Sequence, residues 1–320
     1  MAFKILTRII TLSLLASSVL LASCGAGSIK NPFVPTRVVV FGDAYSDLTT
    51  NAQYTVNGDG SVNNWASQLA ADYGVTNIVS YAKGNARLTN ATGAGGVAVT
   101  SVTQQLSNFL AVDSFKTGDL VLINAGFSDL INEAATTNLV ANATNYGNVY
   151  ANLVRSMVAA GALHVGAANV YDLSRTPAAA IQTNLATLNG NSRSALVAAF
   201  NDQFKSNLGS STATYVGDNV RLLDLEYYMD LVIAAPTVYA YVDATTVVCN
   251  SVDTTNGIGL GTNQVNSSLC TASTINSSAT ATTYNALAYN NYVFADAVYP
   301  TPAAHRSFGT YAYGLTVARW

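Results

Sequence analysis

Short runs of β-branched and aliphatic residues alternate with longer segments of helical periodicity from residue 37 onward. The apolar runs lie at 38–41, 77–82, 119–126, 163–170 and 220–225. The helical patterns between and after them lie at 63–73, 101–112, 145–161, 192–208 and after Pro302. Strands of this length separated by helices of ten or more residues are typical of right-handed βαβ crossovers. The alternation predicts an α/β fold, a three-layer α/β/α sandwich with a mostly parallel sheet.

One segment, at about 243–284, departs from this alternation. It is crowded with Thr, Ser, Asn and Gly and has little periodicity, which is typical of an irregular surface insertion. No repeat and no long polar linker interrupts the remainder of the chain. The pattern therefore predicts a single domain over 36–320 that carries this insertion.

The first residues have the pattern of an export signal. Lys4 and Arg8 precede an apolar run of about 13 residues, which is too short to span roughly 30 Å of hydrocarbon. The following letters LASC resemble the bacterial lipobox, which implies lipidation at Cys24. We expect a signal peptide at 1–23, a tether at 24–35 and an exported protein that a lipid anchors to the membrane. The alternative is an ordinary cleavable signal with an incidental Cys.

The residue after the lipobox Cys bears on the choice of membrane. Gly25 follows Cys24, and it does not match the Asp-type signal for inner-membrane retention. The resemblance to lipoproteins then implies the outer membrane, on either its periplasmic or its surface face.

Charge and composition exclude several classes of partner. Charged residues make up 10% of the chain and the net charge is −3, with no cluster of Lys and Arg, so we expect no nucleic-acid partner. The chain has two His and no closely spaced Cys pair, so no metal-ligand set and no cofactor are expected.

Two further cysteines, Cys249 and Cys270, lie within the insertion. An even pair in an exported chain predicts a disulfide, and a closed loop of about 22 residues stabilises a fold by roughly 3 kcal/mol. A pair of free thiols is the alternative.

Five ordered blocks resemble the GDSL or SGNH family of lipolytic ester hydrolases, especially its secreted bacterial branch. These blocks are FGDAYSD (41–47), NNWASQLA (63–70), SYAKGNAR (80–87), INAGFSDL (123–130) and DAVYPTPAAH (296–305). The resemblance covers roughly residues 36–318 and implies a flavodoxin-like α/β fold. It also implies ester hydrolysis by a Ser nucleophile and an Asp-oriented His base. An oxyanion hole of main-chain N–H groups and an Asn amide completes the family's site.

All four residues that give the SGNH family its name are replaced in this chain. Ala44 stands at the nucleophile position, Asn85 at the oxyanion Gly, Ser128 at the oxyanion Asn and Tyr299 at the base. Asp296, three residues before the base position, is retained. A phenol with a pKa near 10 stays protonated at pH 7, and loss of a nucleophile or base costs about 10⁶-fold in kcat. By the family's mechanism this chain should be nearly inert.

Other residues could replace the lost groups. Ser46 is expected to cap the helix after the first turn, with a surrogate nucleophile as its alternative role. His305 is expected to be a structural His near the start of the last helix, with a surrogate base beside Asp296 as the alternative. His164, in the run 163–170, is expected to be a packed core residue.

Three interpretations follow. The favoured one is a non-catalytic lipoprotein that binds an ester, acyl or glycan ligand in the crevice at the carboxyl ends of the strands. The second is an active esterase or lipase that uses Ser46 or Ser128 with His305 and Asp296. The third is a structural or adhesion protein whose insertion is the working surface. The first is favoured because scaffold residues of the family persist, namely Gly42, Asp43, Asp47, Gly126, Asp129, Asp296 and Pro300.

Overall fold

The computed structural model describes residues 32–133, 139–186, 193–209, 217–280 and 286–320. The expected signal peptide and Cys24 lie outside the described residues. The chain divides into two units, Met1–Phe33 and Val34–Trp320, and the second contains the fold. In the described part of the chain, no helix is both long enough and apolar enough to cross a membrane.

A parallel sheet of five strands forms the centre of the fold, in the order β2-β1-β3-β4-β5. The strands are β1 (Arg37–Phe41), β2 (Ile78–Ser80), β3 (Asp119–Asn124), β4 (Val165–Ala168) and β5 (Val220–Leu223). β1 and β3 are buried along their whole length, as their continuous apolar runs require of central parallel strands. The chain moves outward in opposite directions from β1 and β3, so the topological switch point lies between them. This is the flavodoxin-like order, and the predicted fold class is confirmed.

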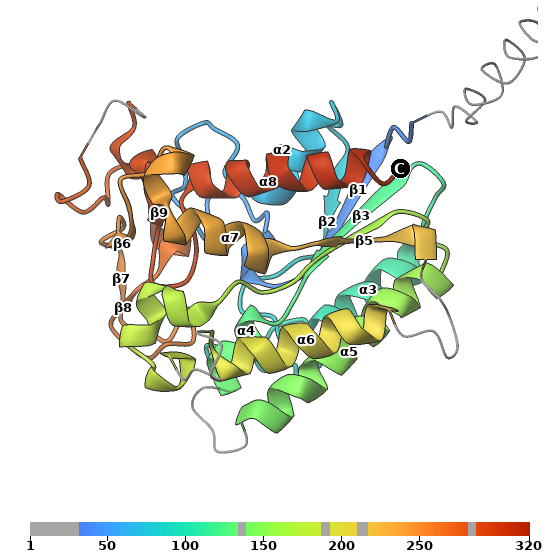
Figure 1. The fold of residues 1–320 in the computed structure, drawn as a ribbon, viewed down its shortest axis with the longest axis horizontal. Helices are drawn as coiled ribbons and strands as arrows, with labels where there is room; N and C mark the ends of the chain where they lie inside the picture. The colour runs from blue at the N-terminus through green and yellow to red at the C-terminus, as the bar shows by residue number, and fades with distance from the viewer. Residues whose placement is uncertain (1–31, 134–138, 187–192, 210–216, 281–285) are drawn as a thin grey trace, which may run out of the picture. The chain divides into compact units, whose positions relative to one another are not determined.

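Helices cover both faces of the sheet (Figure 1). The helices on one face are α2 (Trp65–Asp72), α7 (Leu225–Ala234) and α8 (Pro302–Val317). Those on the other face are α3 (Val102–Val112), α5 (Leu139–Ala159) and α6 (Ala195–Gly209). α2 packs against α8, and α5 packs against α6.

Side-chain caps determine where several of these helices begin. Asn64, Ser101 and Thr301 each accept a hydrogen bond from a main-chain N–H in the first turn of α2, α3 and α8 respectively. Such caps satisfy donors that the helix itself leaves unpaired. Pro302 then occupies the first position of α8, where the missing N–H costs nothing.

Two helices differ from the expected pattern. α4 (Phe127–Glu133) has almost every residue buried, so it shows no amphipathic stripe from which a helix could be predicted. α5 begins at Leu139, six residues before the expected start at residue 145. Short 3-10 helices lie at Ala44–Ser46, Leu173–Arg175, Pro177–Ala180, Thr183–Ala186, Gly217–Asn219, Pro236–Tyr239, Ser267–Leu269 and Ala288–Asn291.

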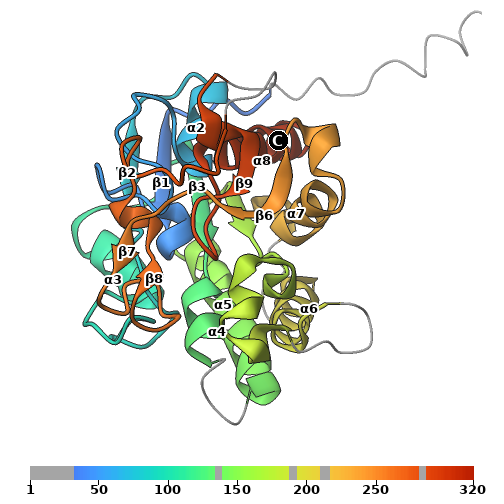
Figure 2. The ribbon, with the colours of Figure 1, turned by 90° about the vertical axis from the view of Figure 1, so that its left-hand side faces the viewer.

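The insertion forms short strands beyond the carboxyl ends of the main sheet (Figures 1 and 2). β6 (Asp243–Val247) pairs in parallel with β9 (Tyr292–Phe294), and β7 (Val252–Asp253) pairs antiparallel with β8 (Gln264–Val265). Cys249 and Cys270 form the predicted disulfide, which is confirmed. Both cysteines are buried in a small apolar cluster of their own.

Candidate functional site

The turn after β1 carries the first of the family blocks. Gly42 has φ +141°, and a Cβ at this position would lie 2.4 Å from the carbonyl oxygen of Asn124, so the turn requires glycine. The next residue, Asp43, caps the 3-10 helix η1 (Ala44–Ser46). Ala44 therefore begins η1 at the switch point, where an α/β enzyme would place its nucleophile, and it is buried.

Asp43 joins the turn after β1 to the turn after β3. Its carboxylate accepts hydrogen bonds from Tyr45 N at 3.2 Å, Phe127 N at 3.0 Å and Asn124 Nδ2 at 2.6 Å. Burial raises the pKa of Asp43 to about 6, and these hydrogen bonds offset part of that rise. Asp43 thereby brings Ala44 close to the start of α4.

Ser128, at the position of the oxyanion Asn, lies in the first turn of α4. It is fully buried, and its Oγ has no hydrogen-bond partner in the described part of the chain. A hydroxyl nucleophile needs a base within hydrogen-bond reach, and Ser128 has none.

Asn85, at the position of the oxyanion Gly, lies in the turn after β2. Its φ is +60°, a conformation that favours glycine and that asparagine tolerates better than most residues. Its Nδ2 donates to the carbonyl of Gly257 at 2.5 Å, which joins the insertion to the turn after β2. The preceding Gly84 N donates to the Asp47 carboxylate at 2.7 Å, which fixes this turn beside η1.

Asp296 and Tyr299 lie on the loop between β9 and α8. The Asp296 carboxylate accepts from the main-chain N–H groups of Ser267 at 2.9 Å, Val298 at 2.8 Å and Tyr299 at 2.7 Å. Asp296 is fully buried, and burial raises its pKa. Its acceptor positions are taken by main chain, so it orients a loop and not a base.

The Tyr299 side chain is fully buried among other aromatic rings. Its ring centroid lies 4.9 Å from that of Tyr54 and 6.3 Å from that of Phe127. Its hydroxyl has no hydrogen-bond partner among the residues described. Burial raises the pKa of Tyr299 well above its ordinary value, and the nearby Asp43 carboxylate raises it further. Tyr299 therefore cannot accept a proton at neutral pH.

The two candidate surrogates, Ser46 and His305, are both built into the core. Ser46 does not cap a helix as expected, because Asp43 and Asn64 hold the cap positions. Instead its Oγ accepts a hydrogen bond from the Trp65 indole N–H at 2.9 Å. Across the described residues, no hydrogen bond joins Ser46 to His305.

His305 lies in the first turn of α8, as expected. Its Nε2 is 3.4 Å from the carbonyl of Tyr54, which can only accept, so this contact requires the Nε2–H tautomer. The imidazole also packs against Tyr45, with ring centroids 4.8 Å apart. Burial lowers the pKa of His305 to about 3. A base that weak, hydrogen-bonded to main chain, is poorly suited to catalysis.

The second histidine takes no part in this centre. His164 immediately precedes β4, at the amino edge of the sheet, and its half-buried ring packs against Trp320 with centroids 5.1 Å apart. Among the described ranges of the chain, no cluster of His, Cys, Asp and Glu could hold a metal ion.

Tyr54 is a member of the centre that the sequence did not single out. Its hydroxyl lies 2.4 Å from where a Cβ of Gly84 would be, so this ring covers the turn after β2 and explains why glycine is needed there. Tyr54 comes from an irregular segment between η1 and α2, so it carries no periodic signal. Its ring packs against that of Tyr299, which in turn lies near the ring of Phe127.

Neither of the two described cavities is lined by Ala44. A pocket of about 120 Å³ is lined by Asp47, Lys83 and neighbouring residues. A groove of about 380 Å³ lies between α3 and α5 and includes Leu106 and Leu153 in its lining. Ala44, Ser128 and Tyr299 line neither of them.

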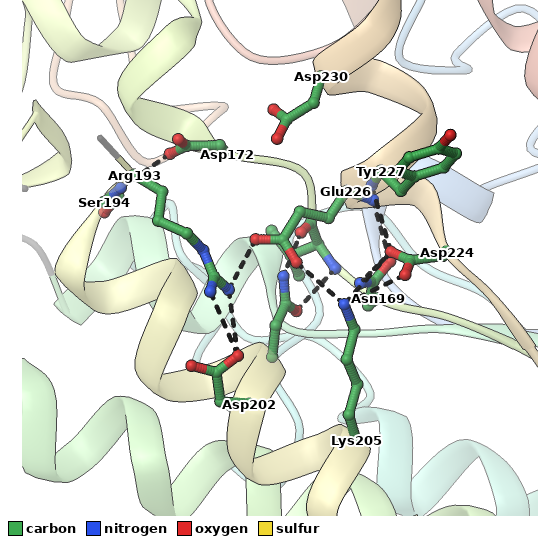
Figure 3. A network of polar contacts seen from close by, with 12 residues as sticks. Asn169, Asp172, Arg193, Ser194, Asp202, Lys205, Asp224, Glu226, Tyr227 and Asp230 are labelled. Atoms are coloured by element: carbon green, nitrogen blue, oxygen red, sulfur yellow. Dashed lines mark hydrogen bonds and ion pairs between the residues drawn. The ribbon is translucent and has the colours of Figure 1, made fainter. Parts of the chain in front are cut away.

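A second polar group, which we call the charge cluster, lies at the ends of β4 and β5 (Figure 3). Arg193 Nη2 is 2.8 Å from Glu226, and Lys205 Nζ is 3.2 Å from both Glu226 and Asp224. Arg193 also contacts Asp202 on α6. These ion pairs join α6 to the first turn of α7.

Comparison with known proteins gives the family of this chain. The family model described as GDSL-like Lipase/Acylhydrolase matches residues 38–311, and the chain belongs to this family. One similar solved structure is a member of the lipolytic protein G-D-S-L family from Veillonella parvula DSM 2008. The similarity covers 89% of this chain and 99% of that chain, with 10% sequence identity and a TM-score of 0.47. A comparison with curated proteins finds no match.

Proposed function

We propose that this chain is a non-hydrolytic member of the GDSL-like family, exported and anchored to the outer membrane by a lipid on Cys24. In this proposal the family scaffold no longer cleaves esters and serves instead to bind an ester, acyl or glycan ligand. The observation that carries the loss of catalysis is the full burial of Tyr299, at the family's base position, against Tyr54 and Phe127, together with a methyl group at the nucleophile position, Ala44.

The substitutions support one another sterically. Replacement of His by Tyr at 299 adds volume, while Ala44 and Ser128 are each smaller than the family's residue at that position. Well-packed cores tolerate a larger side chain only where neighbours give up volume. The aromatic packing is thus what a relinquished reaction centre would be expected to become.

The geometry of the surrogate groups gives the alternative, an active esterase, no comparable support. Ser46 Oγ accepts the Trp65 indole N–H, His305 Nε2 contacts the Tyr54 carbonyl, and Asp296 accepts three main-chain N–H groups. A serine hydrolase without its triad still accelerates the reaction about 10³–10⁴-fold over water through its oxyanion hole and substrate binding. In this chain the residues of that hole are replaced as well.

The proposal is tested by fluorophosphonate labelling of the full-length protein in detergent. We expect no covalent label, because the probe needs an activated serine. Ser46→Ala, Ser128→Ala and His305→Ala serve as matched variants. Labelling of the unmodified protein that any of these variants abolishes would overturn the proposal and favour the esterase.

A further inference from the structure

The amino edge of the main sheet, opposite the candidate site, is where the chain enters the fold. Thr36 N donates to the Gly118 carbonyl at 2.8 Å, directly before β1. Arg37, the first residue of β1, forms ion pairs with Asp113 and Asp119. These contacts fix the entering chain between the end of α3 and the start of β3. Any group attached to the chain upstream is therefore bound covalently to this edge.

The C-terminus lies at the same edge of the sheet (Figure 1). Trp320 Nε1 donates to the carbonyl of Asp218, just before β5, at 2.6 Å. The Trp320 ring packs edge-on against His164, and the His164 carbonyl accepts from Val121 N at 2.8 Å. A series of contacts thus links the C-terminus to the starts of β3, β4 and β5.

Apolar side chains are exposed along this edge. Val112, at the end of α3, is 77% exposed, and Val34, beside β1, is 65% exposed. Leu163 and Val317 are 40% and 45% exposed. We call these four residues and Trp320 the edge rim. Exposed valines occur elsewhere on the fold too, so exposure alone selects no partner, whereas the position beside the entering chain does.

The charges near the edge rim are paired with one another. Lys116 Nζ lies 2.7 Å from the Asp113 carboxylate, which also pairs with Arg37. Arg319 Nη2 lies 2.8 Å from Asp218. The cations that could attract an anionic partner are therefore neutralised by carboxylates. Aliphatic side chains beside a Trp ring match the interfacial region of a bilayer, without a need for anionic lipid.

The length of chain before the fold brings a membrane to this edge. Cys24 and Val34 are ten positions apart in the sequence. A fully extended chain of that length spans at most about 36 Å. A lipid on Cys24 would keep the edge rim within that distance of the bilayer and raise the effective concentration of the lipid surface there. A few apolar side chains then suffice for docking, because the anchor already supplies most of the affinity.

We infer that the edge rim docks on the surface of the bilayer to which the lipid on Cys24 anchors the chain. Trp320 and the aliphatic side chains of the edge rim lie in the interfacial region in this arrangement. The candidate site, at the carboxyl edge, then faces away from the bilayer, and its ligand reaches it from the aqueous side. The inference rests on the proposed function, which supplies the anchor.

The two tryptophans of the chain make docking measurable by fluorescence. Trp65 is fully buried, whereas Trp320 belongs to the edge rim. The lipidated protein is reconstituted into phosphatidylcholine vesicles whose acyl chains carry bromine, which quenches an indole that it contacts. We expect emission to fall about twofold relative to unbrominated vesicles. Trp320→Phe should abolish this difference. Unchanged emission from unmodified protein that floats with the vesicles would overturn the inference.

Charged substitutions test whether the edge rim is the docking surface. The double variant Val112→Asp, Leu163→Asp places carboxylates in the interfacial region, so quenching should fall to the level of Trp320→Phe. Val238→Asp is the matched control, because Val238 is also 77% exposed but lies on the 3-10 helix that precedes β6. It should keep the full quenching. Unchanged quenching in the double variant, or its loss in Val238→Asp, would overturn the inference. Thermal unfolding checks that each variant is folded.

Lipid composition separates apolar docking from electrostatic attraction. Vesicles that contain phosphatidylglycerol should give the same quenching, because the cations at the edge are paired. Quenching that requires phosphatidylglycerol and is lost in high salt would overturn apolar docking. A protein that does not float with vesicles and carries no lipid mass on Cys24 would overturn the anchor in the proposed function. Flotation without quenching overturns the docking alone, so the two failures are distinguishable.

Discussion

The candidate site around Asp43, Ala44, Asn85, Ser128, Asp296 and Tyr299, which we propose is a former reaction centre, lies at the same carboxyl edge of the sheet as the charge cluster. Its buried carboxylates, Asp43 and Asp296, have different partners from Glu226 in the charge cluster. Asp43 and Asp296 accept hydrogen bonds from main-chain N–H groups and the Asn124 amide. Glu226 in the charge cluster is instead paired with Lys205 and Arg193. The half-buried Asp224 combines an ion pair to Lys205 with hydrogen bonds from Tyr227 N and the Asn169 amide. The first arrangement holds turns in place, whereas the second joins two helices.

The comparison explains which family residues survive. Asp43 and Asp296 each bind several main-chain donors, so replacing either would leave those donors unsatisfied in the core. The hydroxyls of Ser128 and Tyr299 have no hydrogen-bond partner among the described residues, whereas the Asn85 amide bonds to Gly257 in the insertion.

The largest expected effect comes from removing the Asp43 carboxylate, which links the turn after β1 to the turn after β3. Asp43→Ala should destabilise the protein by about 3–5 kcal/mol, because Tyr45 N, Phe127 N and Asn124 Nδ2 lose their acceptor. Asp202→Ala in the charge cluster should change stability by less than about 0.5 kcal/mol, because Asp202 is exposed. Urea unfolding measures both, and comparable costs would contradict the distinction.

The disulfide should stabilise the former reaction centre more than the charge cluster. Replacing Cys249 and Cys270 by Ser should cost roughly 3 kcal/mol through the entropy of the unfolded chain. Because the insertion is held to Asn85 and Asp296, hydrogen exchange should accelerate around those residues. Exchange near Glu226 should change less. Uniform acceleration would show that the insertion has no special connection to the centre.

The pH dependence of stability should differ between the regions through His305. Its folded pKa of about 3 lies below the ordinary value of 6.5, so the unfolded chain binds the extra proton in that window. His305 therefore makes stability fall as pH decreases from 6.5 towards 3, by about 1.4 kcal/mol per pH unit. Asp43, with its raised pKa of about 6, contributes in the opposite direction.

A variant isolates the histidine contribution from that of the carboxylates. His305→Gln keeps a polar group but cannot take up the proton. The difference in unfolding free energy between unmodified protein and variant should shift by about 1.4 kcal/mol per pH unit between pH 6 and pH 4. A constant difference would mean that His305 is exposed to solvent or already charged in the folded state.

The smallest expected effect is at the Tyr299 hydroxyl. This hydroxyl has no hydrogen-bond partner among the described residues, so Tyr299→Phe should be neutral or stabilise the protein by up to about 1 kcal/mol. Tyr150→Phe is the matched control. The Tyr150 hydroxyl donates towards the carbonyls of Ile123 and Ala168, at 3.0 and 2.9 Å. Its removal in Tyr150→Phe should lower the free energy of unfolding by about 1–2 kcal/mol. An equal loss of stability in the two variants, measured by thermal unfolding, would indicate that the Tyr299 hydroxyl is hydrogen-bonded.

The fold could be predicted from the sequence because its central strands are continuous apolar runs. Val38, Val39 and Val40 are fully buried, and such an unbroken apolar run is typical of a central parallel strand. The same logic fails for α4, which is buried on every side and leaves no polar face to reveal a helix. The positions of the site residues followed from the family blocks, since the turns after β1, β2 and β3 meet at one sheet edge.

What covers the site could not be predicted. Tyr54 lies in an irregular segment, and Ile258 and Leu260 are two aliphatic residues within a polar insertion. The sequence around them has no periodicity that would predict their burial or the residues they pack against. The insertion was expected at the surface, but part of it is buried against Asn85 and Asp296. Contacts between segments about 170 residues apart depend on the folded path of both and have no local sequence signal.

The most direct test of the loss of hydrolysis is steady-state turnover of a p-nitrophenyl ester by the full-length protein, with His305→Ala and Ser46→Ala as paired variants. We predict a rate equal to that of buffer for all three proteins, because Ala44 and Tyr299 provide neither a nucleophile nor a base. Turnover above buffer that disappears in either variant would contradict the account.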